Sequence, residues 1–563
     1  MPAEPDDDAS QRDTIRLLAW TLLTLALAVA GIVRIVMERR ILPHLDESAT
    51  LLAIEQTAAT GYPLLPSNVF YSQGLTFTFL ATPATWLFDD PQDVLQAARW
   101  INIALGLATL LVIHFITRDA TGSWIAGIAA VIAVGLDPNM VKWSIWIRPY
   151  GALTLVTMLI VLVAIRMVRD GPNARVMRTP APVWIVVLGW LSVFTQVLVA
   201  ILLPAILVVA LILVRKRGLR RLRPVIVAVG LAALAPVALL LLNSQVGVGS
   251  GSGGPSTAVI GSHLLGDTVQ NPFNTHEVWT GLFSGSRLDA IVPFVFLLAA
   301  GICVLGALRT DVPRQRELIV LLSFTLLPIL LMLFIYPSTG QPRYVAHVFP
   351  LGYVVLAASA VLIWPRTRHV FTAFPRYGLA ALIVGIPILY LVQASDYRFA
   401  VEPGGSTTYE ESIEWLSENV GDGDRVIMAL PQLLVFADDD GRLVERSMYL
   451  AGPEDRDRTS RYVKTQSDGA VTDFWLGIPT IASTGALCGA LELDGGAVWL
   501  VVDRFRLNDD SFFGGEMADL IRGSSEEAFT EPNFGRVWEV RPRSGWSAEA
   551  IALCPAAPTR SPG

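Results

Sequence analysis

Long apolar stretches recur through the first 395 residues of this chain, and they constrain its fold more than any other feature. Most of them are long enough to cross about 30 Å of hydrocarbon as a helix. The sequence therefore predicts a mostly α-helical, polytopic membrane protein with about eleven transmembrane helices. These helices are expected at 14–36, 97–117, 123–140, 149–168, 183–195, 197–214, 224–243, 289–308, 318–336, 346–364 and 377–395.

Composition divides the chain into two parts. Hydrophobic residues make up 53% of it and charged residues only 16%, whereas a water-soluble chain needs about a quarter of its residues charged. Residues 1–395 carry 27 Lys and Arg against 20 Asp and Glu, and residues 396–563 carry 15 against 29. We therefore expect a multi-pass membrane domain over 1–395 and an acidic soluble domain over 396–563. The net charge of −7 argues against nucleic acid as a partner.

The distribution of basic residues predicts which loops face the cytoplasm. If the marginal segment 72–88 lies at the membrane interface, all strongly basic loops fall on one face, including the run RKRGLRRLR at 215–223. The positive-inside rule places that face in the cytoplasm of a plasma or inner membrane. The C-terminal domain is then expected outside, with the loops at 37–96, 137–148, 244–288 and 337–345.

The C-terminal domain has the alternating pattern of an α/β fold. Helical periodicity at 407–420 and 516–523 alternates with apolar runs at 425–430, 498–503 and 536–540, which are typical of strands. No glycine-rich phosphate loop follows any of these runs. We therefore expect no nucleotide site in this domain.

The chain has three cysteines, without the spacing of a zinc site. Cys303 lies inside an apolar run, where a thiol is expected to be inert. Cys488 and Cys554 lie in the predicted outer domain, where an oxidising compartment would allow a disulfide. Their positions alone do not decide whether they pair.

Polar residues cluster where the predicted helices end on the outer face. Asp46 and Glu47 follow the first helix, and two adjacent carboxylates at a membrane boundary carry a desolvation cost. Cations and aromatic rings occur in VKWSIWIRPYG at 141–151 and in YPSTGQPRY at 336–344. The residues of interest in and just before these two segments are Asp137, Lys142, Arg148, Tyr150, Arg343 and Tyr344. A solvated loop, or an aromatic belt with snorkelling cations, is the alternative interpretation.

These residue types fit the transfer of a group from a phosphorylated lipid. Cationic side chains could hold the phosphate and stabilise it as it leaves. A carboxylate could accept the proton of an incoming hydroxyl, and phosphate is a good enough leaving group to need no general acid. We predict Asp46 as the general base, with Glu47 orienting Asp46, a metal or the loop. The predicted ligands of the donor phosphate are Arg148, Arg343 and Lys142.

These motifs resemble the GT-C superfamily of glycosyltransferases, in particular the branch with protein O-mannosyltransferases and the lipid A aminoarabinose transferase. The Asp-Glu pair after the first helix is similar to the signature of that family. WSIWIRPYG is similar to its S-x-x-x-R-x-Y segment, and QPRYVAHVFPLGYVV at 341–355 to its P-R-Y-x-x-x-x-x-P segment. YSQGLTFTFL at 71–80 matches a place where that branch has a polar residue before an apolar helix. The resemblance spans nearly all of residues 14–430.

The resemblance implies a membrane glycosyltransferase that moves a sugar from a polyprenyl-phosphate-linked donor in the bilayer to an extracytoplasmic acceptor, with inversion. It places Asp46 at the family's catalytic acidic residue with Glu47 beside it, and Arg148 and Arg343 near the donor phosphate. Residues expected in the substrate pocket are Tyr71, Gln73, Asp137, Tyr150 and Tyr344. The resemblance establishes no cofactor and leaves a divalent metal ion open.

A transporter or flippase of the same lipid-linked sugar is the alternative function. Such a protein would be expected to show inverted repeats or charges near mid-membrane, and the sequence has no clear repeat. The identity of the sugar stays open, and so does the acceptor among protein, lipid and cell-wall glycan.

Overall fold

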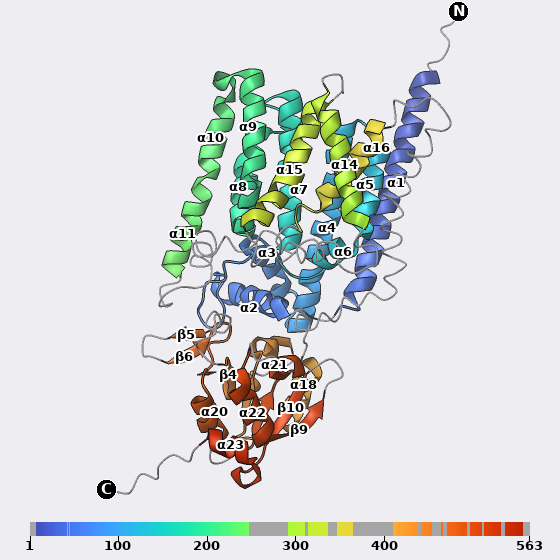
Figure 1. The fold of residues 1–563 in the computed structure, drawn as a ribbon. Coiled ribbons are helices and arrows are strands. Elements are labelled where there is room, and N and C mark those ends of the chain that lie inside the picture. The colour runs from blue at the N-terminus through green and yellow to red at the C-terminus, as the bar shows by residue number, and fades with distance from the viewer. Residues whose placement is uncertain are drawn as a thin grey trace, which may run out of the picture.

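The structure is a computed structural model, and it describes residues 7–41, 43, 45–246, 291–309, 314–335, 346–363, 409–436, 441–452, 463–465, 470–492, 496–508, 512–530 and 535–554. Helices dominate the first part of the chain, and strands alternate with helices after residue 409. In Figure 1 the helices coloured blue to yellow form a bundle, and the orange and red C-terminal elements lie together at one end of it. The helices α2 and α3 lie between these two parts.

Apolar helices joined by short polar connections build the bundle. In chain order its elements are α1 (Asp7–Glu38), α2 (Leu45–Thr60), α3 (Leu75–Ala81), η1 (Thr82–Trp86), α4 (Pro91–Thr121), α5 (Trp124–Leu136), α6 (Pro138–Trp143), α7 (Tyr150–Asp170), β1 (Arg175–Val176), β2 (Thr179–Pro180), α8 (Ala181–Thr195), η2 (Val197–Leu202), α9 (Leu203–Arg217), η3 (Leu219–Leu222), α10 (Arg223–Ala232), α11 (Leu234–Val246), α14 (Ile291–Leu308), α15 (Gln315–Ile335) and α16 (Pro350–Ile363). The prediction of a mostly helical chain is confirmed.

By length and composition, five of the described helical segments could cross a membrane. They are Arg16–Glu38, Pro91–Thr121, Tyr150–Asp170, Val199–Lys216 and Leu219–Leu239. Other apolar helices, among them α5, α8 and α16, are shorter than a bilayer-spanning helix. The crossing predicted at 377–395 lies outside the described residues.

Two predicted boundaries are tested by the helix ends. The break at Thr195-Gln196 is confirmed, because Gln196 has an extended backbone that separates α8 from the next helix. The single helix predicted over 123–140 is wrong. α5 ends at Leu136, because the Asp137 side chain caps α6 and Pro138 occupies the first position of that new helix.

The segment predicted to lie at the interface, 72–88, forms only short helices. α3 has 7 residues and η1 has 5, which is too short to cross a bilayer. Figure 1 shows α3 at the end of the bundle that meets the C-terminal part.

The C-terminal part is built on a six-stranded sheet with strand order β7-β4-β3-β8-β10-β9. Neighbours from β7 to β8 are parallel, whereas β10 pairs antiparallel with β8 and β9. The elements are α18 (Glu410–Asn419), β3 (Arg425–Met428), η8 (Pro431–Phe436), α19 (Arg442–Arg446), β4 (Ser447–Leu450), β5 (Val463–Thr465), β6 (Val471–Asp473), β7 (Thr480–Ile481), α20 (Thr484–Leu491), β8 (Val498–Val501), α21 (Arg504–Asn508), α22 (Gly514–Ser524), β9 (Ser525–Thr530), β10 (Arg536–Val540), η10 (Arg543–Gly545) and α23 (Ala548–Leu553).

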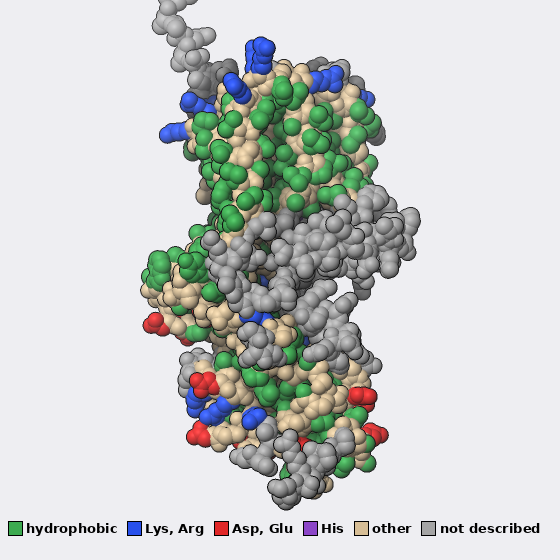
Figure 2. Space-filling view, turned by 90° about the vertical axis from the view of Figure 1, so that its left-hand side faces the viewer, with side chains coloured by type: hydrophobic (Ala, Val, Ile, Leu, Met, Phe, Trp, Pro, Cys, Tyr) green, Lys and Arg blue, Asp and Glu red, His purple; other side chains and the backbone are tan. Residues whose placement is uncertain are grey.

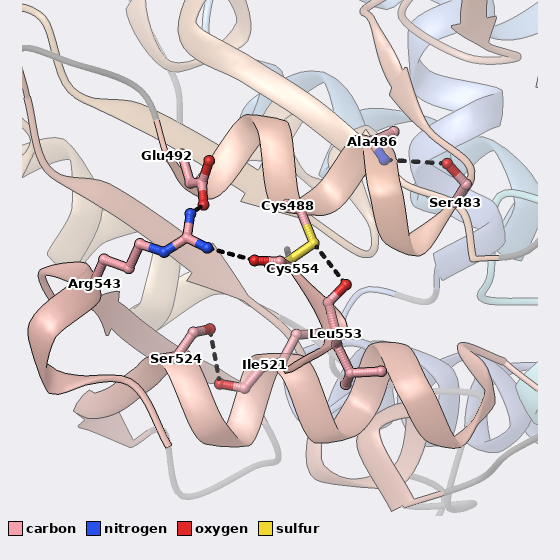
Figure 3. Close-up of a disulfide and its surroundings, with 9 residues drawn as sticks. All are labelled: Ser483, Ala486, Cys488, Glu492, Ile521, Ser524, Arg543, Leu553 and Cys554. Atoms are coloured by element: carbon pink, nitrogen blue, oxygen red, sulfur yellow. Dashed lines mark hydrogen bonds and ion pairs between the residues drawn. A yellow bond between two sulfur atoms is a disulfide. The ribbon is translucent and has the colours of Figure 1, made fainter. Parts of the chain in front are cut away.

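A disulfide joins α20 to the residue after α23. Cys488 and Cys554 are bonded, and their Cα atoms are 5.5 Å apart. Figure 3 shows that Arg543 spans the same junction, because it pairs with Glu492 and donates to the Cys554 carbonyl oxygen. The remaining cysteine, Cys303, is a free and buried thiol.

A hydrophobic core joins the bundle to the C-terminal part. Leu51 and Ile54 of α2 belong to the same buried cluster as Leu433 and Leu434 of η8. Backbone contacts accompany this packing, since the Ser67 N–H donates to the Trp475 carbonyl oxygen at 3.2 Å. The C-terminal part therefore packs directly on the end of the bundle that holds α2.

Charge and apolar surface are separated along the molecule. In Figure 2 hydrophobic side chains cover the visible side of the bundle, and Lys and Arg side chains gather at the end away from the C-terminal part. Arg175, Arg178, Arg220 and Arg221 are exposed in the described connections at that end. This pattern matches a protein whose bundle is surrounded by lipid.

Candidate active site

The two neighbouring carboxylates of the candidate site lie at the start of α2. Asp46 and Glu47 occupy its first turn, where acidic side chains stabilise the positive end of the helix dipole. Successive helix residues point about 100° apart, so the two side chains enter different surroundings. The Glu47 side chain is 0% exposed and the Asp46 side chain is 32% exposed. Of this pair, Asp46 is the one that a substrate can reach.

Arg148 is the cation that faces Asp46. It lies in the loop between α6 and α7, and its Nη2 atom is 3.1 Å from Oδ2 of Asp46. Its Nη1 atom donates to the Asp46 carbonyl oxygen, also at 3.1 Å. Burial lowers the pKa of this guanidinium, but the charge of Asp46 opposes that effect and the pKa stays above its ordinary value. Arg148 is therefore a permanent, buried positive charge.

One donor of Arg148 is unused. The side chain is 9% exposed, and its buried Nε–H has no acceptor among the described residues. An unsatisfied buried donor costs free energy, about 1–3 kcal/mol, unless a ligand or water supplies the acceptor. The guanidinium thus has capacity for a further anionic or polar group.

Tyr71 completes the group around Arg148. Its hydroxyl lies 2.9 Å from the Thr50 hydroxyl of α2 and accepts from Arg148 Nη1 at 3.5 Å. Burial raises the pKa of Tyr71, so the phenol is neutral. Tyr71, which was predicted to line the pocket, therefore contacts Arg148 and lies against the helix that carries Asp46.

The loop that carries this tyrosine approaches the loop before α7 closely. Gly74 has φ +83°, and a Cβ atom there would lie 2.9 Å from the Cβ atom of Pro149. Only glycine combines this backbone with this contact. Gln73, the other pocket residue predicted from this turn, is exposed.

Glu47 fixes the loop that carries Arg148. Its Oε1 atom accepts from the Ile147 N–H at 2.9 Å, and Oε2 accepts from Arg99 Nη2 at 2.7 Å. Arg99 Nη1 also donates to the Ile41 carbonyl oxygen at 3.3 Å and lies 3.7 Å from Glu38 Oε1. This buried cluster ties together the end of α1, the start of α2 and the loop before α7.

Arg99 and Arg34 are two site-supporting residues that sequence reasoning missed. Arg34 is 1% exposed, and its Nε donates to the Ser144 hydroxyl at 2.8 Å, just ahead of Arg148. Its Nη1 donates to the Gly135 carbonyl oxygen at 2.8 Å. Both arginines lie inside predicted apolar spans, and a charge within such a span is the signal that could have identified them.

Lys142 and Tyr150 form an aromatic group next to the Arg148 loop. The Lys142 Nζ atom lies 4.4 Å from the centroid of the Trp146 ring and 5.6 Å from that of Trp143. The Tyr150 ring packs edge-on against Trp143, with 4.8 Å between centroids. The cation of Lys142 thus lies against indole rings, as cation–π contacts favour.

Asp137 lies between α5 and α6 and is buried. It is 3% exposed, its Oδ1 atom caps α6 by accepting from the Met140 N–H at 2.9 Å, and Oδ2 accepts from the Tyr353 hydroxyl at 2.7 Å. Burial raises the pKa of this carboxyl despite these hydrogen bonds. The carboxylate of Asp137 is thus enclosed between helices, and its place in the substrate pocket stays a prediction.

The predicted site residues Arg343 and Tyr344 lie outside the described residues. Among the described residues, no cluster of three or more His, Cys, Asp or Glu side chains could hold a metal ion. The two acidic residues of the site also do not fit a divalent ion, because Asp46 pairs with Arg148 and Glu47 with Arg99. We therefore assign no step to a metal.

No protein-family model matches the chain, and no curated protein matches it in sequence. Its structure is similar to that of ArnT from Cupriavidus metallidurans bound to undecaprenyl phosphate, with 15% identity over 93% of this chain and 99% of that one and a TM-score of 0.51. It is also similar to the oligosaccharyltransferase of Archaeoglobus fulgidus in the apo form, with 12% identity over 93% of this chain and 74% of that one and a TM-score of 0.51.

A further structure of the archaeal protein, AglB in complex with an inhibitory peptide and a dolichol-phosphate, gives a TM-score of 0.50 at 11% identity over 95% of this chain and 77% of that one. At these identities the likeness concerns the fold. The chain shares the fold of ArnT and of the archaeal oligosaccharyltransferase, and the mostly helical fold expected from the sequence is confirmed, whereas the number of about eleven transmembrane helices stays a prediction.

Proposed function

We propose that this protein is a membrane glycosyltransferase that moves a sugar from a polyprenyl-phosphate-linked donor to an extracytoplasmic acceptor, with inversion at the anomeric carbon. The observation that carries the proposal is the Asp46–Arg148 pair at 3.1 Å, a reachable carboxylate beside a buried cation. The fold that holds this pair is shared with ArnT, whose structure is bound to undecaprenyl phosphate.

Arg148 would bind the phosphate of the donor. Its Nε–H has no acceptor among the described residues, and a guanidinium presents several donors to phosphate oxygens in a fixed fork. The Tyr71 hydroxyl, 3.5 Å from Arg148, could donate to the same phosphate or to the sugar. Lys142 and Arg343 would add positive charge around the phosphate.

Asp46 would act as the general base. The acceptor hydroxyl oxygen attacks the anomeric carbon, the carbon–oxygen bond to phosphate breaks, and the phosphate leaves with the bonding electrons. Asp46 takes the hydroxyl proton, and Arg148 stabilises the charge that the phosphate gains. Attack from the face opposite the phosphate inverts the anomeric carbon.

Donor binding would prepare the base. A guanidinium stabilises the charged form of a neighbouring carboxylate, which makes that carboxylate a weaker proton acceptor. When the donor phosphate engages Arg148, it competes with Asp46 for the same charge. The carboxylate of Asp46 then accepts a proton more readily, once the donor is bound and the acceptor hydroxyl can attack.

One domain would lie in the bilayer and the other in the extracytoplasmic water. We assign residues 1–395 to a multi-pass domain with about eleven crossings, and residues 396–563 to an extracytoplasmic α/β domain in a plasma or inner membrane. The basic end of the bundle, opposite the C-terminal part, supports this orientation (Figure 2).

Thiol labelling tests the orientation. The described cysteines leave little background, because Cys303 is buried and the other two are bonded to each other. In intact cells, a membrane-impermeant maleimide should label an exposed Glu418→Cys variant and spare an exposed Arg221→Cys variant. The reverse result would contradict the proposed topology.

The activity is tested with purified protein in nanodiscs. A panel of undecaprenyl-phosphate-linked hexoses and pentoses is added with a membrane extract as the source of acceptors. We expect at least one donor to be cleaved, with release of undecaprenyl phosphate, by the wild type and not by Asp46→Asn. Movement of intact donors across the bilayer without cleavage would identify a flippase and overturn the proposal.

A further inference from the structure

A groove opens at the basic end of the bundle, far from the candidate active site. It lies between the end of α7 and the turn that joins α9 to α10. The residues that line it are Asp170, Gly171, Pro172, Asn173, Arg220, Arg221 and Pro224. The site described above uses none of these residues.

The groove carries surplus positive charge. Among the described residues, neither Arg220 nor Arg221 takes part in an ion pair, and both are exposed. The single carboxylate of the lining, Asp170, is already paired with Arg169 through contacts of 2.9 and 3.0 Å. The amide of Asn173 is exposed at the same place and offers a further donor. An anion in this groove would meet two guanidiniums without displacing a partner of either one.

Apolar surface continues from the groove. Leu219, beside the two arginines, is 64% exposed, and Ile226 and Val227 on α10 are 51% and 59% exposed. Exposed aliphatic side chains on a bundle helix are suited to contact acyl chains. A ligand that fits both features has a phosphate at one end and hydrocarbon at the other.

We propose that this groove binds the head group of an anionic phospholipid in the cytoplasmic leaflet. The phosphodiester would accept from Arg220 and Arg221, and the acyl chains would lie along the exposed side of α10. Arginine suits this role because its planar fork binds phosphate oxygens in pairs. This inference is independent of the proposed transferase activity, and the assignment to the cytoplasmic leaflet rests on the proposed orientation.

Lipid retention in native mass spectrometry tests the proposal. The protein is purified in detergent with phosphatidylglycerol or with phosphatidylcholine, and bound lipids are counted. We expect phosphatidylglycerol to be retained preferentially. Arg220→Ala/Arg221→Ala should weaken that retention roughly 30-fold, since each of the two cations near an anionic head group contributes about 1 kcal/mol and each 1.4 kcal/mol is a factor of about ten. Equal retention of the two lipids by the wild type would overturn the proposal.

A matched control separates the groove from general surface charge. Arg175→Ala/Arg215→Ala removes two exposed arginines from the same end of the bundle without touching the groove lining. It should keep phosphatidylglycerol retention within about twofold of the wild type. Equal losses in both double variants would mean that the basic surface attracts lipid without a site, which overturns the proposal.

Two further measurements complete the test. The melting temperatures of both lipid-free double variants should stay within about 2 °C of the wild type, as expected for exposed substitutions. If the double alanine variant were unstable, two other variants would replace it: Arg220→Lys/Arg221→Lys and the single substitution Arg220→Ala. The double lysine variant keeps both positive charges and should retain more phosphatidylglycerol than Arg220→Ala. Excess inorganic phosphate should not displace the lipid; full displacement would identify a free-phosphate site and overturn the proposal.

Discussion

Two adjacent carboxylates at one helix start have opposite surroundings in this protein. Asp46 points to the surface and to Arg148, whereas Glu47 is buried against Arg99 and the backbone of Ile147. The rotation of about 100° between consecutive helix residues is enough to separate the two. A reachable carboxylate can exchange a proton with a substrate, and a buried one that already accepts three hydrogen bonds can only hold structure.

Asp46→Asn should reduce sugar transfer by roughly 10²–10⁴-fold, because the amide cannot take the acceptor proton. Donor binding should be unchanged or tighter, since the amide competes less than a carboxylate for Arg148. Turnover and donor affinity are measured separately, with undecaprenyl-phosphate sugars in nanodiscs. Near-normal turnover in this variant would exclude Asp46 as the base.

Glu55 on α2 predicts a pH dependence of stability. Burial raises its pKa from 4.5 to about 7, so the folded protein binds a proton there that the unfolded chain has released. Stability should therefore fall as the pH rises from 4.5 to about 7, and stay lowered above that pH. Glu55→Gln should recover roughly 1–3 kcal/mol at alkaline pH and nothing below the unfolded pKa.

Thermal unfolding on both sides of this pH window measures the Glu55 effect. Exposed Glu418→Gln provides the control, because it removes one carboxylate from the surface. A gain from Glu55→Gln that is the same at every pH would show that it comes from packing and not from ionisation.

The sequence could reveal Asp46, Arg148 and Tyr71, because polar residues at the ends of apolar runs are conspicuous. It did not reveal Arg99 or Arg34, because the mean hydropathy of a long apolar window stays high when the window contains a single charged residue. Asp137 was assigned to the pocket from its position in an outer loop. Its capping of α6 and its bond to Tyr353 depend on packing between segments distant in the chain.

At the scale of elements, the loop between α6 and α7 depends on a buried ionic cluster. Arg99 contacts both Glu47 at 2.7 Å and Glu38 at 3.7 Å, so it neutralises two carboxylates from two helix ends. Removal of Arg99 deprives the carboxylates of Glu47 and Glu38 of this cation, whereas removal of Glu47 leaves Arg99 paired with Glu38. The two ends of this cluster are therefore not equivalent.

Arg99→Gln should destabilise the protein by about 3–5 kcal/mol, as expected when a buried charge loses its partner. Glu47→Gln should cost less, about 1–2 kcal/mol, because its amide oxygen can still accept from Ile147 and Arg99 keeps Glu38. Melting temperatures give the order. A larger loss in Glu47→Gln than in Arg99→Gln would contradict this account of the cluster.

Activity distinguishes this supporting role from a catalytic one. Glu47→Gln should keep much of the sugar transfer that Asp46→Asn loses, and its loss should fall on donor affinity, because Arg148 is less firmly placed. If Glu47→Gln abolished turnover with unchanged donor affinity, Glu47 would belong to the chemistry itself.

Element boundaries followed from sequence where local chemistry sets them. The polar pair Thr195-Gln196 predicted a break after α8, and the helix does end there. Asp137-Pro138 carries an equally local signal for a helix start, but an apolar window over 123–140 concealed it. Local caps were thus better guides to helix ends than average hydropathy.

At the scale of the molecule, composition predicted two parts but not how they meet. The apolar run PQLLVF of η8 looks like the core of its own domain, and nothing in the sequence indicates that it packs on α2. In the structure Leu434 is buried in one cluster with Leu51 and Ile54, on the helix that begins with Asp46. The C-terminal part therefore supports the helix that carries the proposed base.

This shared core predicts that a substitution in the C-terminal part reaches the candidate site. Leu434→Ala removes a fully buried side chain next to α2 and should cost about 2–5 kcal/mol. Leu520→Ala removes an equally buried leucine from a separate core of the C-terminal part and serves as the matched control. Hydrogen–deuterium exchange of α2 and sugar transfer are compared in the two variants.

We expect faster exchange across Leu45–Thr60 and reduced transfer in Leu434→Ala, because the cavity loosens the contact that holds α2. Leu520→Ala should lose comparable stability while α2 exchanges as in the wild type, since its cluster contains no residue of the bundle. If the two variants changed α2 equally, the effect would come from global destabilisation. If neither changed it, α2 would be held by the bundle alone, and the C-terminal part would not support the site.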